Sequence, residues 1–255
     1  MSEGNHDVFH LGLNRSDLEG AEIALIPGDP GRVPKIATHL ENARDLANTR
    51  EYRSMLGYSG ETPVLVMSTG IGGPSAAIAV EELALLGVKR FLRIGTTGAI
   101  QPHIEAGDVV ITTAAVRMDG ASRHIAPQEY PAVADFHMVR RLVAAAERIG
   151  ARYHLGVTAS SDTFYQGQGR KDSFRKGFVH RELANKIEEL QNLNVLSYEM
   201  EAGTVLTQTS AYGLGGACIS GVLVNRTRAE FPDAAVIGET VLKTIQVAIA
   251  SLKED

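Results

Sequence analysis

The sequence predicts an α/β fold, in which a mixed, largely parallel twisted sheet carries helices on both faces. Short runs of aliphatic residues alternate with helical stretches along the whole chain, as expected for strands joined by crossover helices. No Pro-, Ser- or Gly-rich linker interrupts this alternation, and 255 residues suffice for one large domain. We therefore expect a single domain over residues 1–255.

The first half of the chain shows the alternation most clearly. A buried strand over residues 21–27 precedes the turn GDPGR and a short helix that ends near His39. A second strand, 62–70, leads into a helix with Pro74 in its first turn and Gly87 as its stop. Two more strands are expected over residues 89–95 and 107–116.

The second half repeats the pattern with longer helices. Residues 131–150 have helical periodicity and end at Gly150. Strands are expected over residues 152–161, 194–199 and 217–225, and helices over residues 200–213 and 233–253.

Polar residues gather where the predicted strands end. In open α/β sheets, ligands bind beyond the carboxyl ends of the strands. The polar segments there are residues 28–32, 69–75, 93–97, 162–170, 199–201 and 225–228. We expect the functional site to be built from them.

The composition excludes several classes of protein. A net charge of −5 argues against a nucleic-acid binder with a broad basic face. Cys218 is the one cysteine, so we expect neither an internal disulfide nor a cysteine metal cluster. The N-terminus is polar and acidic, unlike a signal peptide, and no apolar run reaches the roughly 20 residues of a membrane span. A cytoplasmic enzyme is the expectation.

Two arginines after predicted strands suggest an anion site. Arg32 lies in GDPGR, where Gly28 allows close backbone approach, and Arg93 opens the predicted turn RIGTTG, where Thr96 adds a hydroxyl. The alternatives are a solvated Arg32 and a structural salt bridge at Arg93. Phosphate fits best because a dianion can engage several arginines. TGIGGPS has Ser75 where a dinucleotide loop needs glycine, so the phosphate is expected to be a reactant.

The segment SYEMEAG places two carboxylates close together. On a strand, Glu199 and Glu201 would project to one face. They could form an acid/base pair, as in glycosidases, or accept hydrogen bonds from vicinal sugar hydroxyls. The alternative is that both pair with arginines. Met200 between them is more typical of a core residue.

The segment SSDTFYQGQGR could bind a heterocyclic base. The Gln168 amide is both donor and acceptor, which suits a ring N–H next to a carbonyl, as on a uracil edge. Arg170 could bind a second carbonyl, and Phe164 could stack on the ring. The alternative is a polar surface loop. Arg226 in LVNRTR could serve the same site or form a structural ion pair with Glu199.

Taken together, these segments resemble the first family of nucleoside phosphorylases, and within it the uridine phosphorylases. The matching segments are GDPGRV, TGIGGPS, RIGTTGAIQPHI, GDVVITTA, VTASSDTFYQGQGR, YEMEAG and GVLVNRTR. The resemblance runs from VFHLGL to the last strand and so covers nearly the whole chain. It is weakest over residues 56–61, in the loop 171–182 and in the C-terminal helix.

The resemblance implies a role for each matching residue. It implies phosphate binding by Gly28, Arg32, Arg93 and Thr96, with Arg50 supplied by a neighbouring subunit. It implies ribose binding by Thr96, Met200 and Glu201, with His10 from the neighbour. It implies base binding by Phe164, Gln168 and Arg170, supported by Tyr198, Glu199 and Arg226. The catalytic residues would be Arg93, Gln168, Arg170 and Glu201.

The resemblance also implies partners. The family assembles as dimers, commonly as a hexameric trimer of dimers. Some members hold a monovalent cation such as K⁺ at the dimer interface, and the matching positions are Glu51, Ile71 and Ser75. No cofactor is expected to be required, because phosphate is the co-substrate.

The resemblance further favours a pyrimidine substrate. Purine-specific members carry an aspartate after the last strand, whereas this chain has the run Val224-Asn225-Arg226. The expected reaction is inverting phosphorolysis of uridine to uracil and α-D-ribose 1-phosphate, in pyrimidine nucleoside catabolism and salvage, with deoxyuridine and thymidine left open. The alternatives are a nucleoside hydrolase, which would need no phosphate, and a non-catalytic nucleoside- or anion-binding protein.

Overall fold

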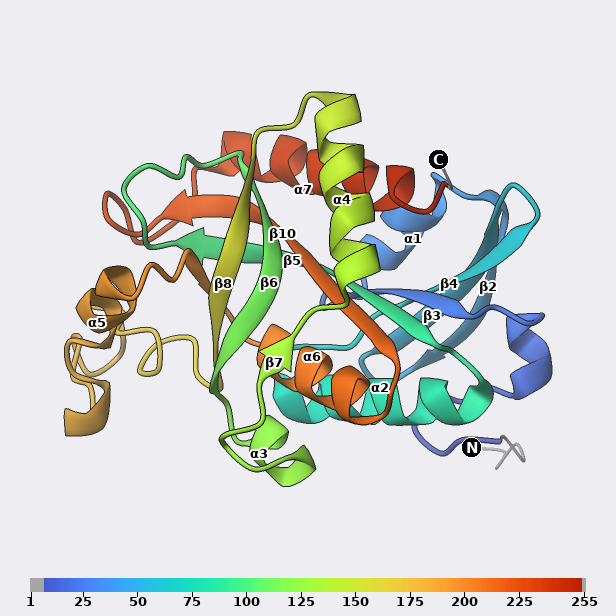
Figure 1. The fold of residues 1–255 in the computed structure, drawn as a ribbon, viewed down its shortest axis with the longest axis horizontal. Coiled ribbons are helices and arrows are strands. Elements are labelled where there is room, and N and C mark those ends of the chain that lie inside the picture. The colour runs from blue at the N-terminus through green and yellow to red at the C-terminus, as the bar shows by residue number, and fades with distance from the viewer. Residues whose placement is uncertain (1–6, 254–255) are drawn as a thin grey trace.

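A ten-stranded sheet forms the centre of the protein in a computed structural model that describes residues 7–253 (Figure 1). The strands are β1 (Ile23–Pro27), β2 (Glu41–Thr49), β3 (Tyr52–Ser59), β4 (Thr62–Met67), β5 (Arg90–Ala99), β6 (Val109–Met118), β7 (Ala132–Val133), β8 (Tyr153–Ser161), β9 (Ser197–Glu199) and β10 (Gly215–Asn225). The helices are α1 (Arg32–Ala37), α2 (Gly73–Leu86), α3 (Ala121–Ile125), α4 (Phe136–Ile149), α5 (Lys186–Asn192), α6 (Ala202–Ala211) and α7 (Ala234–Ala250), with short 3₁₀ turns at Arg15–Leu18 and Arg181–Leu183.

Part of the sheet closes on itself. The strand order is β10-β6-β8-β9-β5-β1-β4-β3-β2, and β10 also pairs with β5. Strands β5, β9, β8, β6 and β10 therefore form a closed ring, and β1, β4, β3 and β2 extend it as an open sheet. Among the pairings described, five are parallel and five antiparallel. The expected mixed sheet is confirmed, with a more even mixture than the alternation suggested.

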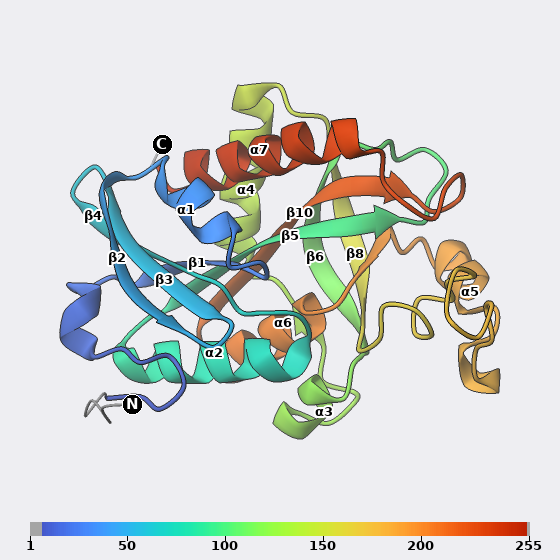
Figure 2. The same cartoon turned by 180° about the vertical axis from the view of Figure 1, so that it is seen from behind.

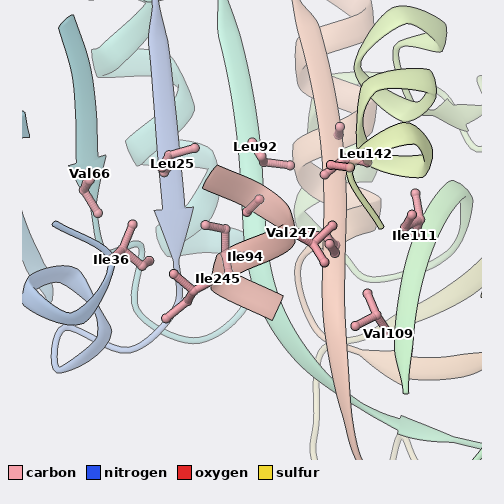
Figure 3. Packing of buried hydrophobic residues seen from close by; sticks show 14 of the residues in the cluster. Leu25, Ile36, Val66, Leu92, Ile94, Val109, Ile111, Leu142, Ile245 and Val247 are labelled. Atoms are coloured by element: carbon pink, nitrogen blue, oxygen red, sulfur yellow. The ribbon is translucent and has the colours of Figure 1, made fainter. Parts of the chain in front are cut away.

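Helices cover both faces of the sheet, as expected. Helices α1, α4 and α7 lie on one face, and α2, α3 and α6 lie on the other (Figures 1 and 2). The alternation of strand side chains explains this arrangement. Leu25 of β1 packs in the cluster with α1, α4 and α7, which Figure 3 shows, whereas its neighbour Ile26 packs in the cluster with α2.

Two parts of the sheet differ from the expectation. RIGTTG is not a turn: it continues β5, because residues Gly95–Ala99 pair with β10 and Gly98 also pairs with β9. The β2–β3 hairpin was missed because most β2 side chains are exposed, so the edge strand lacks an apolar alternation.

The boundaries elsewhere follow the expected order with local shifts. The helix expected over residues 131–150 begins only at Phe136, because residues 132–133 pair with β6 and Asp135 caps the helix with its side chain. Helices α3 and α5 were not expected; both are short. None of the helices in the described range combines the length and apolarity that a membrane crossing needs.

The core cluster between β5 and helices α4 and α7 provides a stability test. Leu92 is 1% exposed in this cluster, so Leu92→Ala should lower the free energy of unfolding by about 2–5 kcal/mol through the cavity it leaves. Leu155→Ala is the matched control, because Leu155 is 49% exposed on β8 and should change stability by no more than about 0.5 kcal/mol. Urea unfolding followed by circular dichroism measures both. Equal losses in the two variants would contradict the assigned packing.

Candidate active site

A cavity of about 680 Å³ opens beside the carboxyl ends of β1 and β9 and along β5 and β10. Thirteen of the predicted site residues line it: Gly28, Arg32, Glu51, Ile71, Arg93, Thr96, Phe164, Gln168, Arg170, Tyr198, Glu199, Met200 and Glu201. The expectation that polar residues after separate strands would meet in one place is therefore correct. The cavity has two polar groups of different chemistry, one around Arg93 and one around Arg170.

Arg93 is buried within β5 and faces two carboxylates. Its Nη2 donates a hydrogen bond to Glu201, and its Nε lies 3.7 Å from Glu199 Oε2. Burial alone would lower the pKa of Arg93, but the Glu201 and Glu199 charges raise it above its usual value. The Nε and Nη1 groups have no hydrogen-bond partner among the described residues. The buried cation thus retains donors for a ligand.

Glu199 orders the start of α6. Its Oε2 accepts hydrogen bonds from the backbone N–H groups of Glu201 at 2.8 Å and Ala202 at 2.6 Å, and the Ser160 hydroxyl donates to its Oε1. Burial raises the pKa of Glu199, and the nearby Arg93 opposes that rise. With its oxygens engaged in this way, Glu199 is suited to positioning. Ser160 was not predicted from the sequence, because serine in a strand gives no signal of its own.

Glu201 lies nearer to the open cavity. One carboxylate oxygen binds Arg93, and the other accepts the Gly72 N–H at 2.6 Å. Gly72 has a φ of 94°, which favours glycine and brings the loop before α2 to this carboxylate. Glu199 ends β9 while Glu201 is the residue just before the first turn of α6, so the expectation that they share one face of a strand is wrong. The alternative, that both pair with an arginine, is confirmed, and it is the same arginine.

Arg32 lies beside Arg93 at the start of α1. Its Nη1 donates to the Ile94 carbonyl at 3.3 Å, and its Nε lies 3.8 Å from Asp29 Oδ2. Burial and the Arg93 charge lower the pKa of Arg32. Two neighbouring guanidinium groups that repel each other favour an anion between them. A Cβ at Gly28 would lie 3.1 Å from the Gly70 carbonyl, so any larger residue there would push the Gly70 backbone away by a few tenths of an ångström.

The two threonines of β5 have different roles. The Thr97 hydroxyl donates to the Tyr198 carbonyl at 2.6 Å. The Thr96 hydroxyl has no hydrogen-bond partner within residues 7–253, and Thr96 lines the cavity. Thr96 is therefore the threonine available to a ligand. The extra residue Leu223 on β10, where the pairing with β5 shifts register, also lines the cavity.

The second polar group lies in the loop after β8. Gln168 and Arg170 are 3% and 4% exposed, and the Arg170 Cζ lies 3.8 Å from the centre of the Phe164 ring. Arg170 Nη1 donates to the Glu230 carbonyl at 2.7 Å. In the described part of the chain, the Gln168 side-chain amide has no hydrogen-bond partner. A buried amide beside an arginine and an aromatic ring is suited to a flat polar heterocycle.

Arg226 does not line the cavity, but it holds residues of this group in place. It donates to the Gln168 carbonyl at 2.6 Å and to Glu230 Oε2 at 3.0 Å. The predicted alternative, an ion pair between Arg226 and Glu199, is wrong, because Glu230 four residues along the chain takes that role. Sequence reasoning missed Glu230, because residues 226–230 form a turn outside any helix and the sequence gives no signal for this pairing. Tyr198, another residue of the cavity lining, is also buried, and this burial raises the pKa of its hydroxyl to about 12.

His10 and Arg50 do not line the cavity. His10 Nδ1 lies 2.6 Å from Glu82 Oε1, and the same carboxylate accepts the backbone N–H groups of His10 and Leu11. Arg50 is exposed at the β2–β3 turn, with a φ of 56°. The cavity of one chain therefore lacks these two predicted contacts. Their supply by a neighbouring subunit stays a prediction.

The three residues predicted to hold a monovalent cation lie around Gly70. A Cβ at Gly70 would approach Glu51 Cγ to 2.8 Å and Ser75 Oγ to 3.3 Å. Ser75 Oγ donates to the Ile71 carbonyl at 3.2 Å. Carboxylate, carbonyl and hydroxyl oxygens are hard donors of the kind that K⁺ accepts, so these residues fit the ion. Cation binding itself stays a prediction.

Comparison with known proteins places the chain in a family. The family model described as "Phosphorylase superfamily" matches residues 22–253. The uridine phosphorylase of Escherichia coli (strain K12) is 52% identical to this chain over 97% of each sequence. The uridine phosphorylase of Thermococcus kodakarensis is 44% identical over 93% of this chain and 86% of its own length.

A relative named for a different base also matches. The guanosine phosphorylase of Halorubrum lacusprofundi is 40% identical over 82% of this chain and 80% of its own length. The relatives that match this chain therefore include proteins named for a pyrimidine nucleoside and a protein named for a purine nucleoside. The resemblance expected from the segments GDPGRV to GVLVNRTR is confirmed: the chain belongs to the phosphorylase superfamily, in which its uridine phosphorylase relatives lie.

Proposed function

We propose that the protein is a uridine phosphorylase, which converts uridine and phosphate reversibly to uracil and ribose 1-phosphate. The observation that carries this proposal is the presence of two chemically different groups in one cavity. Arg32 and Arg93 offer cationic donors at one end, and Gln168 and Arg170 offer amide and guanidinium groups at the other. The uridine phosphorylases among the relatives support the same assignment.

In the proposed reaction, phosphate attacks the anomeric carbon from the face opposite the base. Arg32 and Arg93 hold the nucleophile, helped by the Gly28 amide and the Thr96 hydroxyl, and this positioning lowers the entropic part of the barrier. Glu201 accepts hydrogen bonds from ribose hydroxyls, beside Met200. The transition state has oxocarbenium character, as in other glycosyl transfers, and the configuration is inverted.

The departing base is proposed to leave as an anion. Its charge spreads over two carbonyl oxygens, which Gln168 and Arg170 are suited to stabilise electrostatically. Purine specificity is disfavoured by Asn225. Its side-chain N–H groups donate to the carbonyls of Gln101 at 2.9 Å and Ile104 at 2.6 Å, and its oxygen accepts from Thr227. No acid is therefore available there to protonate a purine ring nitrogen.

We further propose that the site is completed by a second subunit. His10 and Arg50 lie outside the cavity, while Ile71 is 78% exposed beside the cavity-lining Glu51. A dimer, assembled further into a hexamer, would bring His10 and Arg50 of one copy to the cavity of the next. K⁺ held by Glu51, Ile71 and Ser75 would lie at that interface, and a cytoplasmic location is proposed for the enzyme.

Uracil release from uridine tests the reaction class. Release should depend on added phosphate, because Arg32 and Arg93 bind phosphate as the nucleophile. Ultraviolet absorbance with and without phosphate measures it, with thymidine, deoxyuridine and guanosine as parallel substrates. Release without phosphate would show a hydrolase, and stabilisation by uridine without turnover would show a binding protein. Faster turnover of guanosine than of uridine would contradict the base assignment.

Substitution of the buried arginine tests the phosphate site. Arg93→Gln should lower kcat/KM for phosphate by about 100-fold or more, because it removes a donor that acts on the reacting phosphate. Arg90→Gln is the matched control, since Arg90 lies on the same strand and does not line the cavity. Steady-state kinetics with varied phosphate measures both, after circular dichroism has shown that each variant is folded. Wild-type phosphate kinetics in Arg93→Gln would remove the assignment.

Substitution of the buried glutamine tests the base site. Gln168→Ala should lower kcat/KM for uridine by roughly 100-fold, because the uracil anion loses one hydrogen-bond donor. Gln166→Ala is the matched control, because Gln166 is exposed two residues earlier and lies outside the cavity lining. Arg170→Ala is expected to act like Gln168→Ala. Unchanged uridine turnover in both site variants would show that the base binds elsewhere.

A further inference from the structure

A second cavity, of about 450 Å³, adjoins the first between α1 and α7. The two helices lie side by side on the same face of the sheet (Figures 1 and 2). Asp29, Arg32, Thr96 and Leu223 line both cavities. The partition between the cavities therefore includes two side chains of the proposed phosphate site, Arg32 and Thr96.

The second cavity has a cationic wall. Arg32 and Lys35 of α1 supply its two cations, His39 follows just after the helix, and Asp29 is the acidic residue among the described lining residues. The opposite wall is formed by aliphatic residues of α7, such as Val241 and Leu242. The whole chain has a net charge of −5, which repels anions. A local cationic opening counters this repulsion and concentrates small anions at one place.

Arg32 is held only by long contacts. Its hydrogen bond to the Ile94 carbonyl is 3.3 Å long, and its closest Asp29 oxygen is 3.8 Å away. Its side chain is 15% exposed, compared with 6% for Arg93. Arg32 can therefore bind an anion from the side of the second cavity, whereas Arg93 is enclosed with its two carboxylates.

We propose that inorganic phosphate reaches Arg32 and Arg93 through this second cavity while a nucleoside occupies the first. The inference rests on the proposed phosphorolysis. A nucleoside that contacts Gln168 and Glu201 occupies part of the first cavity, next to the Arg93 guanidinium that Glu201 binds. Gln168 and Glu201 do not line the second cavity, so this cavity offers phosphate a route to Arg32 that does not pass through the space of the nucleoside.

Gly238 allows this route to be closed selectively. It lies on α7 in the lining of the second cavity, and a Cβ added there meets no atom within 4 Å. A side chain can therefore start at this position without a clash of its Cβ, and Gly238→Phe is designed to narrow the second cavity. Gly238→Ala is the matched control, because a methyl group leaves most of the cavity open.

The test compares phosphate kinetics at saturating uridine with uridine kinetics at saturating phosphate. Gly238→Phe should lower kcat/KM for phosphate about tenfold, the scale of an access and steering effect. Its kcat/KM for uridine should match the wild type and Gly238→Ala. Uridine should also become inhibitory and competitive with phosphate in Gly238→Phe, because phosphate must then pass through the first cavity, which uridine partly occupies.

A second variant tests the charge of the route. Lys35→Glu should lower kcat/KM for phosphate at low salt and approach the wild-type value as salt screens the charge. Wild-type phosphate kinetics in both Gly238→Phe and Lys35→Glu would overturn the proposal, as would an equal loss for both substrates in Gly238→Phe. The wild-type protein is assayed alongside, so a failure of phosphorolysis itself is recognised separately.

Discussion

The buried guanidinium of Arg93 is the interaction on which the rest of the site depends. A charge inside a sheet is stable only when it is paired, and removal of one partner from a buried pair costs about 3–5 kcal/mol. Glu201 binds Arg93 directly, and Glu199 lies near its Nε while holding the first amides of α6. The charge thus fixes the positions of β5, β9 and α6 relative to each other. Its Nε and Nη1 nitrogens, which make no hydrogen bond to the described residues, are then left for a ligand.

The closed ring of strands explains how separate segments meet at this charge. Because β10 pairs with both β5 and β6, the segments after β8 and β9 are brought around to the end of β5. The register shift at Leu223 lets β10 bend along β5 and places Leu223 between the two cavities. The position of Arg93 and its two glutamates is therefore fixed by strand pairing. The loop after β8 adds the second polar group, Gln168 and Arg170.

Much of the fold and of the site could be predicted from local patterns. The apolar runs at residues 21–27, 107–116 and 217–225 are strands because their side chains are buried on both faces, which leaves a strong sequence signal. The exposed edge strand β2 leaves none, and it was missed. Glu230 was also missed, because its role as partner of Arg170 and Arg226 depends on a loop that the pattern does not position.

The sequence by itself determined most of the strands and helices in their order along the chain, the residue types of the two polar groups around Arg93 and Arg170, and the resemblance that unites them. These are local properties, set by side-chain periodicity, turn residues and short motifs. Only the tertiary structure decided that RIGTTG is a strand, that one arginine serves both glutamates, and that a second cavity adjoins the first. Each of these depends on pairing between distant segments: Arg93 and Glu201 are 108 residues apart. Such pairing is selected by closure of the whole sheet and by the free-energy cost of burying an unpaired charge.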